Sequence, residues 1–307
     1  MHTRLKASCI GSLAAQILRE KNRKPIGTVT SVFPNSLYVR TINDELLFVA
    51  NRSLKSPITI NIEPTVNLQQ LIKPQEQVSG NAREILLGRE VSVDLTEAAS
   101  YAPPDGSSRE VGQLSRIREA VRMIALILRV VDATGSVLDE TSVTHKTAAE
   151  FAHDGILALR EGDEDQFRTR AESLVGLGTG FTPSGDDMLG GFLVSYNSLA
   201  EKLKRSRFVL DFSIIEKRTN WISAKLLDYM QRLLLDEQLA AIVESQLSDA
   251  PDDLVRGIET ILPRGHTSGL DIATGAVLGL AAAHDIASGD TETEIVTEKL
   301  EFKSTSN

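Results

Sequence analysis

The feature that most constrains the fold is a pattern that occurs twice in the C-terminal half of the chain. Residues 180–193 read GFTPSGDDMLGGFL, and residues 265–278 read GHTSGLDIATGAVL. With Pro183 deleted, both copies align as Gly-x-Thr-Ser-Gly-x-Asp-x-x-x-Gly. Two such similar segments in one chain predict two similar pieces of structure that pack against each other.

Each copy is a flexible loop that runs into an apolar helix. We expect Ser184 and Ser268 to cap the two helices, which places Asp187 and Asp271 in the first helical turns. The glycine that ends each pattern falls one turn later on the same face, where small residues let two backbones approach. The sequence therefore predicts a pseudo-symmetric pair of helices with both loops at one end.

Two helix N-termini at one place favour a small anion. The first N–H groups of a helix have no partner within the helix, and the helix dipole adds partial positive charge there. A carboxylate or phosphate would fit, and Arg264 is suited to pair with either. The predicted substrate-binding residues are Gly178, Gly180, Thr182, Ser184, Gly185, Asp186, Arg264, Gly265, Thr267, Ser268 and Gly269.

The candidate catalytic residues are His266, Asp187 and Asp271. His266 lies in the second loop, where it can act as a general acid or base, and either aspartate can orient it. The simpler interpretation is a loop histidine without a catalytic role. Asp186 and Asp187 can also be interpreted as ligands of Mg²⁺. We favour a structural role for Asp186, so no metal and no other cofactor is assigned.

Three well-known motifs are absent. Gly176, Gly178 and Gly180 begin like a dinucleotide-binding loop, but Pro183 stands where the third glycine belongs, and a helix precedes the loop. No lysine occurs between residues 147 and 201, so the segment is not a phosphate-binding Walker loop. Neither serine lies in the Gly-x-Ser-x-Gly motif of hydrolases.

The rest of the sequence predicts an α+β fold. Segments rich in β-branched residues between Gly27 and Leu95 predict about five strands, with a possible short helix over 76–90. Apolar residues recur every three or four positions from Leu114 onward, which indicates helices. The predicted helices cover residues 114–128, 146–160, 164–175, 186–203, 219–232, 236–247, 252–261 and 269–286.

The domain organisation follows from these patterns. We predict a β-rich domain with a leading helix over residues 1–100, and a helical domain with the two glycine-rich loops over 114–290. The segment 101–113 holds two prolines and several polar residues, so it is predicted to link the domains. The polar segment 291–307 is predicted to be a loosely held tail.

Composition limits the possible partners and location. The net charge of −9 gives no general attraction to nucleic acid. Cys9 is the only cysteine, which excludes a disulfide within the chain and fits a reducing compartment. No apolar run was found that approaches the length of a membrane span, so a cytoplasmic protein is expected.

The two loops resemble the signature stretches of the AllH-like family. The stretches are GLGTGFTPSGDDMLGGFL and GHTSGLDIATGAVLGL, and the first is the more specific because Gly-x-Thr-Pro-Ser-Gly-Asp-Asp-x-Leu is long. The order of a β-rich part and a helical part is also similar. The positions that the resemblance implicates are Gly178, Gly180, Thr182, Pro183, Ser184, Gly185, Asp186, Asp187, Gly265, His266, Ser268, Gly269 and Asp271.

The resemblance implies a subunit of oxamate carbamoyltransferase, which acts in allantoin and hence purine breakdown. In that reaction oxalurate and phosphate give oxamate and carbamoyl phosphate, and the family implies assembly with other, unrelated subunits. The leading hypothesis is thus an enzyme subunit that binds a small anion and stabilises an oxyanion with backbone N–H groups. The alternatives are a non-catalytic ligand-binding or scaffold subunit, and a metal-assisted hydrolase that uses Asp186 and Asp187.

Overall fold

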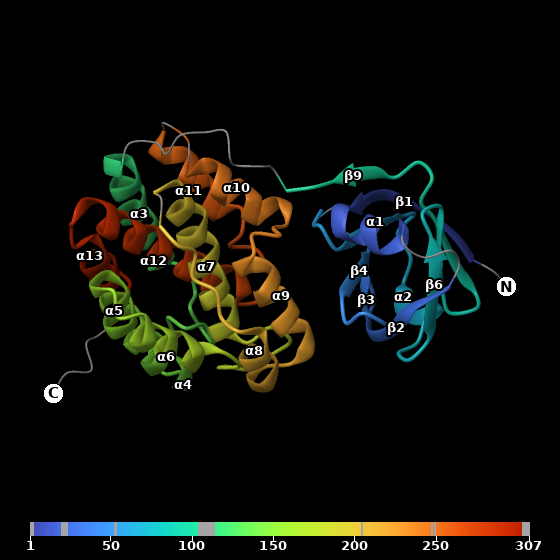
Figure 1. The fold of residues 1–307 in the computed structure, drawn as a ribbon, viewed down its shortest axis with the longest axis horizontal. Coiled ribbons are helices and arrows are strands. Elements are labelled where there is room, and N and C mark those ends of the chain that lie inside the picture. The colour runs from blue at the N-terminus through green and yellow to red at the C-terminus, as the bar shows by residue number, and fades with distance from the viewer. Residues whose placement is uncertain are drawn as a thin grey trace. The chain divides into compact units, whose positions relative to one another are not determined.

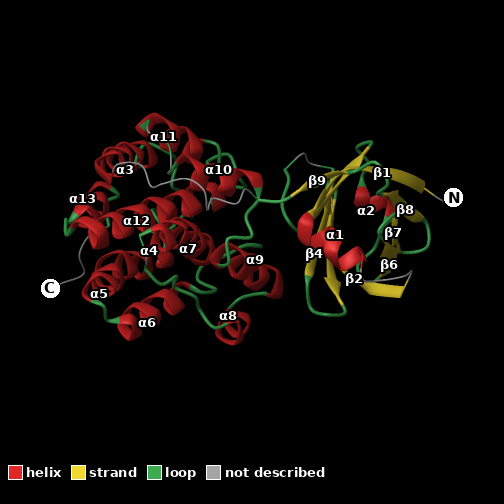
Figure 2. Ribbon diagram, turned by 45° about the horizontal axis from the view of Figure 1, so that its top comes forward, coloured by secondary structure: helices red, strands yellow, loops and turns green. Residues whose placement is uncertain are grey.

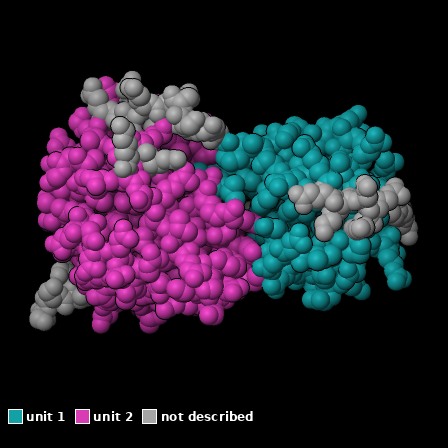
Figure 3. Space-filling view, in the orientation of Figure 1, with its two compact units in different colours: residues 1–104, 234–237 teal, residues 105–233, 238–307 magenta. Residues whose placement is uncertain are grey.

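The computed structural model describes residues 3–19, 24–51, 54–103, 114–203, 205–246, 248 and 250–302. The chain divides into two compact units, which Figure 3 colours separately. The β unit comprises Met1–Pro104 and Leu234–Glu237, and the helical unit comprises Asp105–Leu233 and Gln238–Asn307. The predicted α+β fold, with a β-rich part followed by a helical part, is confirmed. Most of the predicted linker, residues 104–113, lies outside the described residues.

The β unit is a closed sheet with two short helices (Figure 2). The strands follow the spatial order β5-β4-β3-β2-β6-β7-β8-β1-β9, and β1 also pairs with β5, which closes the barrel. The elements are β1 (Thr3–Gly11), α1 (Ser12–Arg19), β2 (Lys24–Phe33), β3 (Ser36–Thr41), β4 (Leu46–Ala50), β5 (Thr59–Glu63), α2 (Leu68–Leu71), β6 (Gln77–Asn81), β7 (Glu84–Leu87), β8 (Val91–Asp94) and β9 (Ala99–Tyr101).

Two local predictions for this unit need correction. The predicted helix near the N-terminus is present as α1, but strand β1 precedes it, with Leu5, Ala7 and Cys9 buried at every second position. That period of two is the signal of a strand. The possible helix over 76–90 is instead the hairpin of β6 and β7, which pair antiparallel.

The helical unit is built around two long central helices, α7 and α12 (Figure 1). Its elements are α3 (Leu114–Leu128), α4 (Val143–Glu150), the π-helical turn η2 (Phe151–Gly155), α5 (Ile156–Glu161), α6 (Glu164–Leu174), α7 (Ser184–Lys202), α8 (Phe212–Arg218), α9 (Trp221–Gln231), α10 (Glu237–Ser245), α11 (Pro251–Glu259), α12 (Ser268–Ser288) and α13 (Glu292–Lys299). The predicted helices are confirmed, with ends that differ by a few residues, although the π-helical turn divides the one predicted over 146–160. Helices α8 and α13 were not predicted.

The polar segment that was predicted to be a loose tail is folded as far as Phe302. It forms α13, and Glu292, Thr293 and Val296 are buried. Asp285 at the end of α12 accepts hydrogen bonds from the backbone N–H groups of Glu292 and Thr293, at 2.7 and 2.8 Å. A buried carboxylate thus holds the start of this helix, which composition alone did not indicate. Residues 303–307 lie outside the described part of the chain.

Helices α7 and α12 are the predicted pair, and their backbones touch. A Cβ atom at Gly191 would overlap the carbonyl oxygen of Ile272, and one at Gly275 would overlap that of Met188. The glycine that ends each copy of the sequence pattern is therefore required by the close crossing of the two helices. Every residue of α12 from Gly269 to Asp285 is buried.

Helix α12 corrects the expectation that the chain has no segment long enough to span a membrane. Its 21 residues have the length and apolar composition for one, but 89% of its most apolar window is buried inside the protein. The surrounding helices supply the apolar environment, so its composition is that of a core helix.

Two neighbouring glycines of α7 allow a matched test of this crossing. Gly191→Ala would place a methyl group against the Ile272 backbone, whereas Gly190→Ala would meet only the flexible end of Met230, at 2.6 Å from Cε. We expect Gly191→Ala to lower the free energy of unfolding by about 3 kcal/mol or more, because backbone must move. Gly190→Ala should lower the free energy of unfolding by at most about 1 kcal/mol, because the higher helix propensity of alanine, worth a similar amount, offsets the contact with Met230. Urea unfolding measures both; equal losses would contradict the close crossing.

Candidate functional site

The structure brings the two glycine-rich loops together at the start of α7 and α12. The hydroxyl oxygens of Thr182 and Ser268 lie 3.1 Å apart, although the residues are 86 positions apart in sequence. Both helices therefore begin at one place, as the repeated pattern predicts. The positive ends of their dipoles lie on the same side of the helical unit.

The two serines begin the helices but do not cap them. The carbonyl oxygen of Pro183 accepts from the N–H of Asp187 at 3.1 Å, and that of Thr267 accepts from the N–H of Asp271 at 2.9 Å. Pro183 and Thr267 are thus the residues before the first turn, and the predicted caps at Ser184 and Ser268 are one residue too late. The Ser184 hydroxyl instead donates to the carbonyl oxygen of Gly135 at 3.4 Å.

The second residue of each helix has the same role in both copies. The N–H of Gly185 donates to the carbonyl oxygen of Leu177 at 2.8 Å, and the N–H of Gly269 donates to the carbonyl oxygen of Arg264 at 2.9 Å. Packed backbone also leaves no room for a Cβ atom at either glycine. These two N–H groups are therefore used within the fold, and the donors that a ligand could reach belong to other residues.

Asp187 is the most perturbed acid of the site. Its side chain is buried, and its Oδ2 accepts from the Thr182 hydroxyl at 3.0 Å. Burial raises the pKa of Asp187 to about 7, although hydrogen bonds from Ser268 and Thr182 lower it. The charge of Asp271 raises the pKa further, and that of Arg264 lowers it. A carboxyl group near pKa 7 can gain or lose a proton at neutral pH.

Asp271 is the equivalent residue of the second copy, and it is fully buried. Its Oδ1 accepts from the Ser136 hydroxyl at 2.7 Å and from the N–H of Val137 at 2.8 Å. Burial raises its pKa, and the hydrogen bonds from Ser136 and Val137 act against this rise. Its Oδ2 has no hydrogen-bond partner within the part of the chain that the structure describes.

A third loop, residues 129–142, completes the site, and it was missed in the sequence. The N–H of Thr134 donates to Asp132 Oδ1 at 3.0 Å, and the N–H of Gly135 donates to Asp139 Oδ2 at 2.9 Å. These turns present Ser136 and Val137 to Asp271. Clustered Asp, Thr, Gly and Ser residues predict such turns, but no local signal shows that they contact a helix more than 130 residues away.

Asp186 points away from Asp187 and has a structural role. Its Oδ1 accepts from the N–H of Gly176 at 2.7 Å, and its Oδ2 accepts from the hydroxyls of Thr219 and Ser223 at 2.5 and 2.6 Å. Both oxygens are thus occupied in joining the loop to α9. Among the described residues, no group of three histidine, cysteine, aspartate or glutamate side chains could hold a metal ion. The two aspartates therefore do not fit as ligands of one Mg²⁺.

The remaining predicted residues lie on the outer part of the loops. Gly178, Gly180, Gly265 and His266 are exposed, and Arg264 and Thr267 are half-buried. The charge of His266 acts on Asp132, whose pKa is lowered mainly by hydrogen bonds from Thr134. Among the described residues no hydrogen bond joins His266 to Asp187 or Asp271, so the orientation of this histidine by an aspartate stays a prediction.

Two protein-family descriptions match the chain. Residues 174–280, which include both loops and most of α7 and α12, match the family described as oxamate carbamoyltransferase subunit AllH. Residues 6–100, the β unit, match the AllH family N-terminal domain. The chain belongs to the AllH family. The family is described as a subunit, which suggests assembly with other carbamoyltransferase subunits. No solved structure matches the chain.

The raised pKa of Asp187 predicts a pH-dependent stability. Because the native pKa lies above that of the unfolded chain, the native state holds an extra proton between about pH 4 and 7. The free energy of unfolding should therefore fall as the pH rises through this window, by on the order of 4 kcal/mol from this group.

Urea unfolding at several pH values measures this fall. We expect a smaller decrease for Asp187→Asn than for the wild type, whereas Asp252→Asn, a change at an exposed position of α11, should follow the wild type. An unchanged pH dependence in Asp187→Asn would mean that this carboxyl group titrates alike in the folded and unfolded chains.

Proposed function

We propose that this AllH-family chain binds a small anionic substrate where α7 and α12 begin, as part of an oxamate carbamoyltransferase. The proposed reaction converts oxalurate and phosphate into oxamate and carbamoyl phosphate in allantoin breakdown. The observation that supports it most is the contact of Thr182 with Ser268, which joins two helix N-termini beside the buried carboxyl group of Asp187. We also propose a cytoplasmic location, since the only cysteine, Cys9, is free and buried.

The local charge explains how an acidic chain could hold such a substrate. Two helix dipoles and Arg264 supply positive potential, and Arg264 lies near enough to lower the pKa of Asp187. The hydroxyls of Thr182 and Ser268 lie at the starts of the two helices, and once Asp187 is protonated they can donate to an oxyanion instead of to its carboxylate. When Asp187 is protonated, its carboxyl group is neutral and does not repel the ligand. The site is thus suited to a carboxylate or phosphate at neutral pH.

The proposed reaction requires one proton to move from phosphate to the leaving nitrogen, and we assign this transfer to Asp187. An oxygen of hydrogen phosphate attacks the ureido carbonyl carbon of oxalurate, and the bond from that carbon to the inner nitrogen breaks. The nitrogen leaves as the amide of oxamate and takes up the proton that phosphate loses, so charge and atoms balance. A protonated carboxyl group with a pKa of about 7 can donate its proton to the leaving nitrogen and take up the proton that phosphate loses.

A scaffold or ligand-binding subunit without catalysis is the second candidate. The loop contacts favour it, because the N–H groups of Gly185 and Gly269 are already bonded within the fold and so do not stabilise an oxyanion. His266 is also exposed, whereas the two aspartates are buried. In this case the same anion would stabilise the loops, and the chemistry would belong to a partner subunit.

Phosphate-dependent consumption of oxalurate, measured with this chain alone and with its partner subunits, tests the proposal. We expect Asp187→Asn to lower kcat of the assembled enzyme by about 100-fold or more, as for loss of a general acid–base group. Asp252→Asn is the matched control and should retain full activity. Full activity of the assembly with Asp187→Asn would exclude proton transfer by this residue and favour the scaffold role.

A further inference from the structure

A cavity lies toward the other end of the central helices, within the helical unit. Its volume is about 550 Å³, and it is lined by residues of α5, by Tyr196 of α7, by the end of α12 and by the segments that follow these helices. A 19-residue helix is about 28 Å long, so this cavity is distant from the loops where α7 begins. A cavity of this size holds a small organic molecule.

Tyr196 of α7 is the polar group built into this cavity. The residue is only 6% exposed, and its ring stacks on Phe192 with centroids 5.8 Å apart. Its side chain lines the cavity, where the phenol hydroxyl can donate one hydrogen bond to a ligand. Burial raises the pKa of Tyr196, so the phenol remains a donor at neutral pH.

Arg205 and Ser206 add further donors beside this hydroxyl. Both line the cavity, and the charge of Arg205 acts on Tyr196. Within the described part of the chain, the Arg205 guanidinium forms no ion pair, and Ser206 forms no side-chain hydrogen bond. Both side chains are exposed to solvent, and a guanidinium without an ion pair near a phenol is suited to a carboxylate group.

The lining also contains two exposed acidic side chains. Glu161 and Glu164 line the cavity and form no ion pair within the described residues, and the charge of Glu164 also acts on Tyr196. Helices α5 and α12 end here at Gly162 and Gly289, so their terminal carbonyl groups add partial negative charge. These groups favour a cationic end of a ligand.

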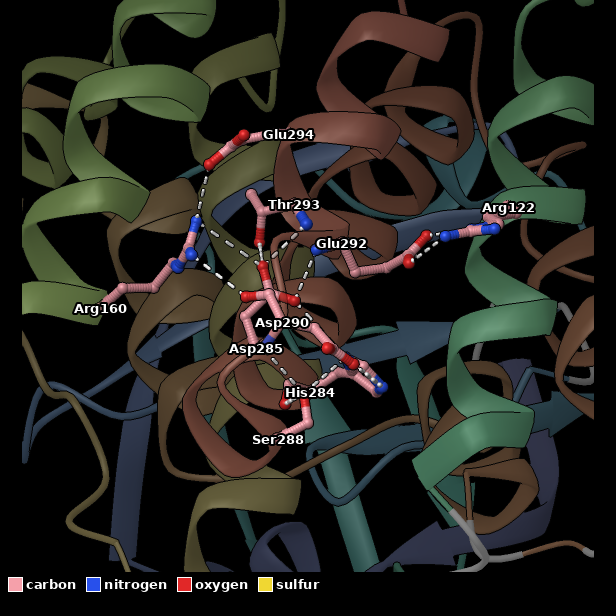
Figure 4. A network of polar contacts seen from close by, with 9 residues as sticks. All are labelled: Arg122, Arg160, His284, Asp285, Ser288, Asp290, Glu292, Thr293 and Glu294. Atoms are coloured by element: carbon pink, nitrogen blue, oxygen red, sulfur yellow. Dashed lines mark hydrogen bonds and ion pairs between the residues drawn. The ribbon is translucent and has the colours of Figure 1, made fainter.

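The other charges of the lining are already paired, as Figure 4 shows. Arg160 contacts Asp285 at 3.9 Å and Glu294 at 3.3 Å, and its Nη2 donates to the carbonyl oxygen of Asp290 at 3.1 Å. Asp285 also accepts hydrogen bonds from Thr293. This network is therefore the wall of the cavity, and Arg205, Glu161 and Glu164 remain for a ligand.

We propose that this cavity binds a small zwitterion that carries one carboxylate and a cationic amino or guanidino group, such as a basic amino acid. The carboxylate would pair with Arg205 and the Tyr196 hydroxyl. The cationic group would face Glu161 and Glu164, and the aliphatic stem would lie against Leu159 and Ile286. Because the cavity is separate from the proposed anion site, its ligand would be a second ligand of the chain.

Isothermal titration calorimetry of the full chain with L-arginine tests this proposal. Agmatine lacks the carboxylate and L-norvaline lacks the guanidinium, so the two separate the contributions of each end. We expect saturable binding of L-arginine, and binding of either analogue weaker by about tenfold or more, which is the loss of one charged contact. Arg205→Gln and Tyr196→Phe should each weaken L-arginine binding at least about fivefold, with Tm unchanged.

Two control variants make the result specific. Arg118→Gln removes an exposed arginine of α3, outside the cavity, and should bind L-arginine as the wild type does. Asp187→Asn should also bind normally, so failure of the proposed reaction and failure of this site are distinguishable. Absence of saturable binding at millimolar L-arginine, or binding that is insensitive to both Arg205→Gln and Tyr196→Phe, would overturn the proposal.

Discussion

The close crossing of α7 and α12 determines the rest of the helical unit. Gly191 lies against the backbone of Ile272, and Gly275 lies against that of Met188, so the two helices meet at a distance that no larger residue permits. The crossing lies within two turns of both helix starts. The loops that precede the helices are therefore forced together, and Thr182 reaches Ser268. Other elements surround this pair and exclude water from it.

Exclusion of water raises the pKa values of the acids in the site. Asp186 and Asp187 are neighbours in sequence, but successive residues on a helix face different sides. Asp186 is satisfied by three donors and holds its loop to α9, whereas Asp187 faces the second copy of the pattern. Burial acts on both carboxyl groups. The pKa of Asp187, which lies beside Asp271, is raised to about 7. Position on the helix thus separates a structural acid from a candidate proton carrier.

The sequence predicted the helix pair because its signals are local and repeated. Periodic apolar residues indicate helices, and the Gly-x-Thr-Ser-Gly-x-Asp-x-x-x-Gly pattern contains both the loop and the contact glycine. Strand β1 was missed because its alternation was less obvious than the amphipathic stretch of α1 that follows. The contact of Ser136 with Asp271 and the burial of α13 depend on residues that are distant in sequence. A single sequence contains no local signal for such contacts.

The central claim is that the two copies of the pattern form one site, and a cysteine cross-link tests it most directly. In the double variant Thr182→Cys, Ser268→Cys the sulfur atoms would replace hydroxyls that lie 3.1 Å apart. We predict that mild oxidation joins them within one chain and leaves Cys9 as the only thiol that reacts after unfolding. Each single variant should show no such loss of thiols. If both introduced thiols of the folded double variant remain reactive after oxidation, the loops do not meet and the account is wrong.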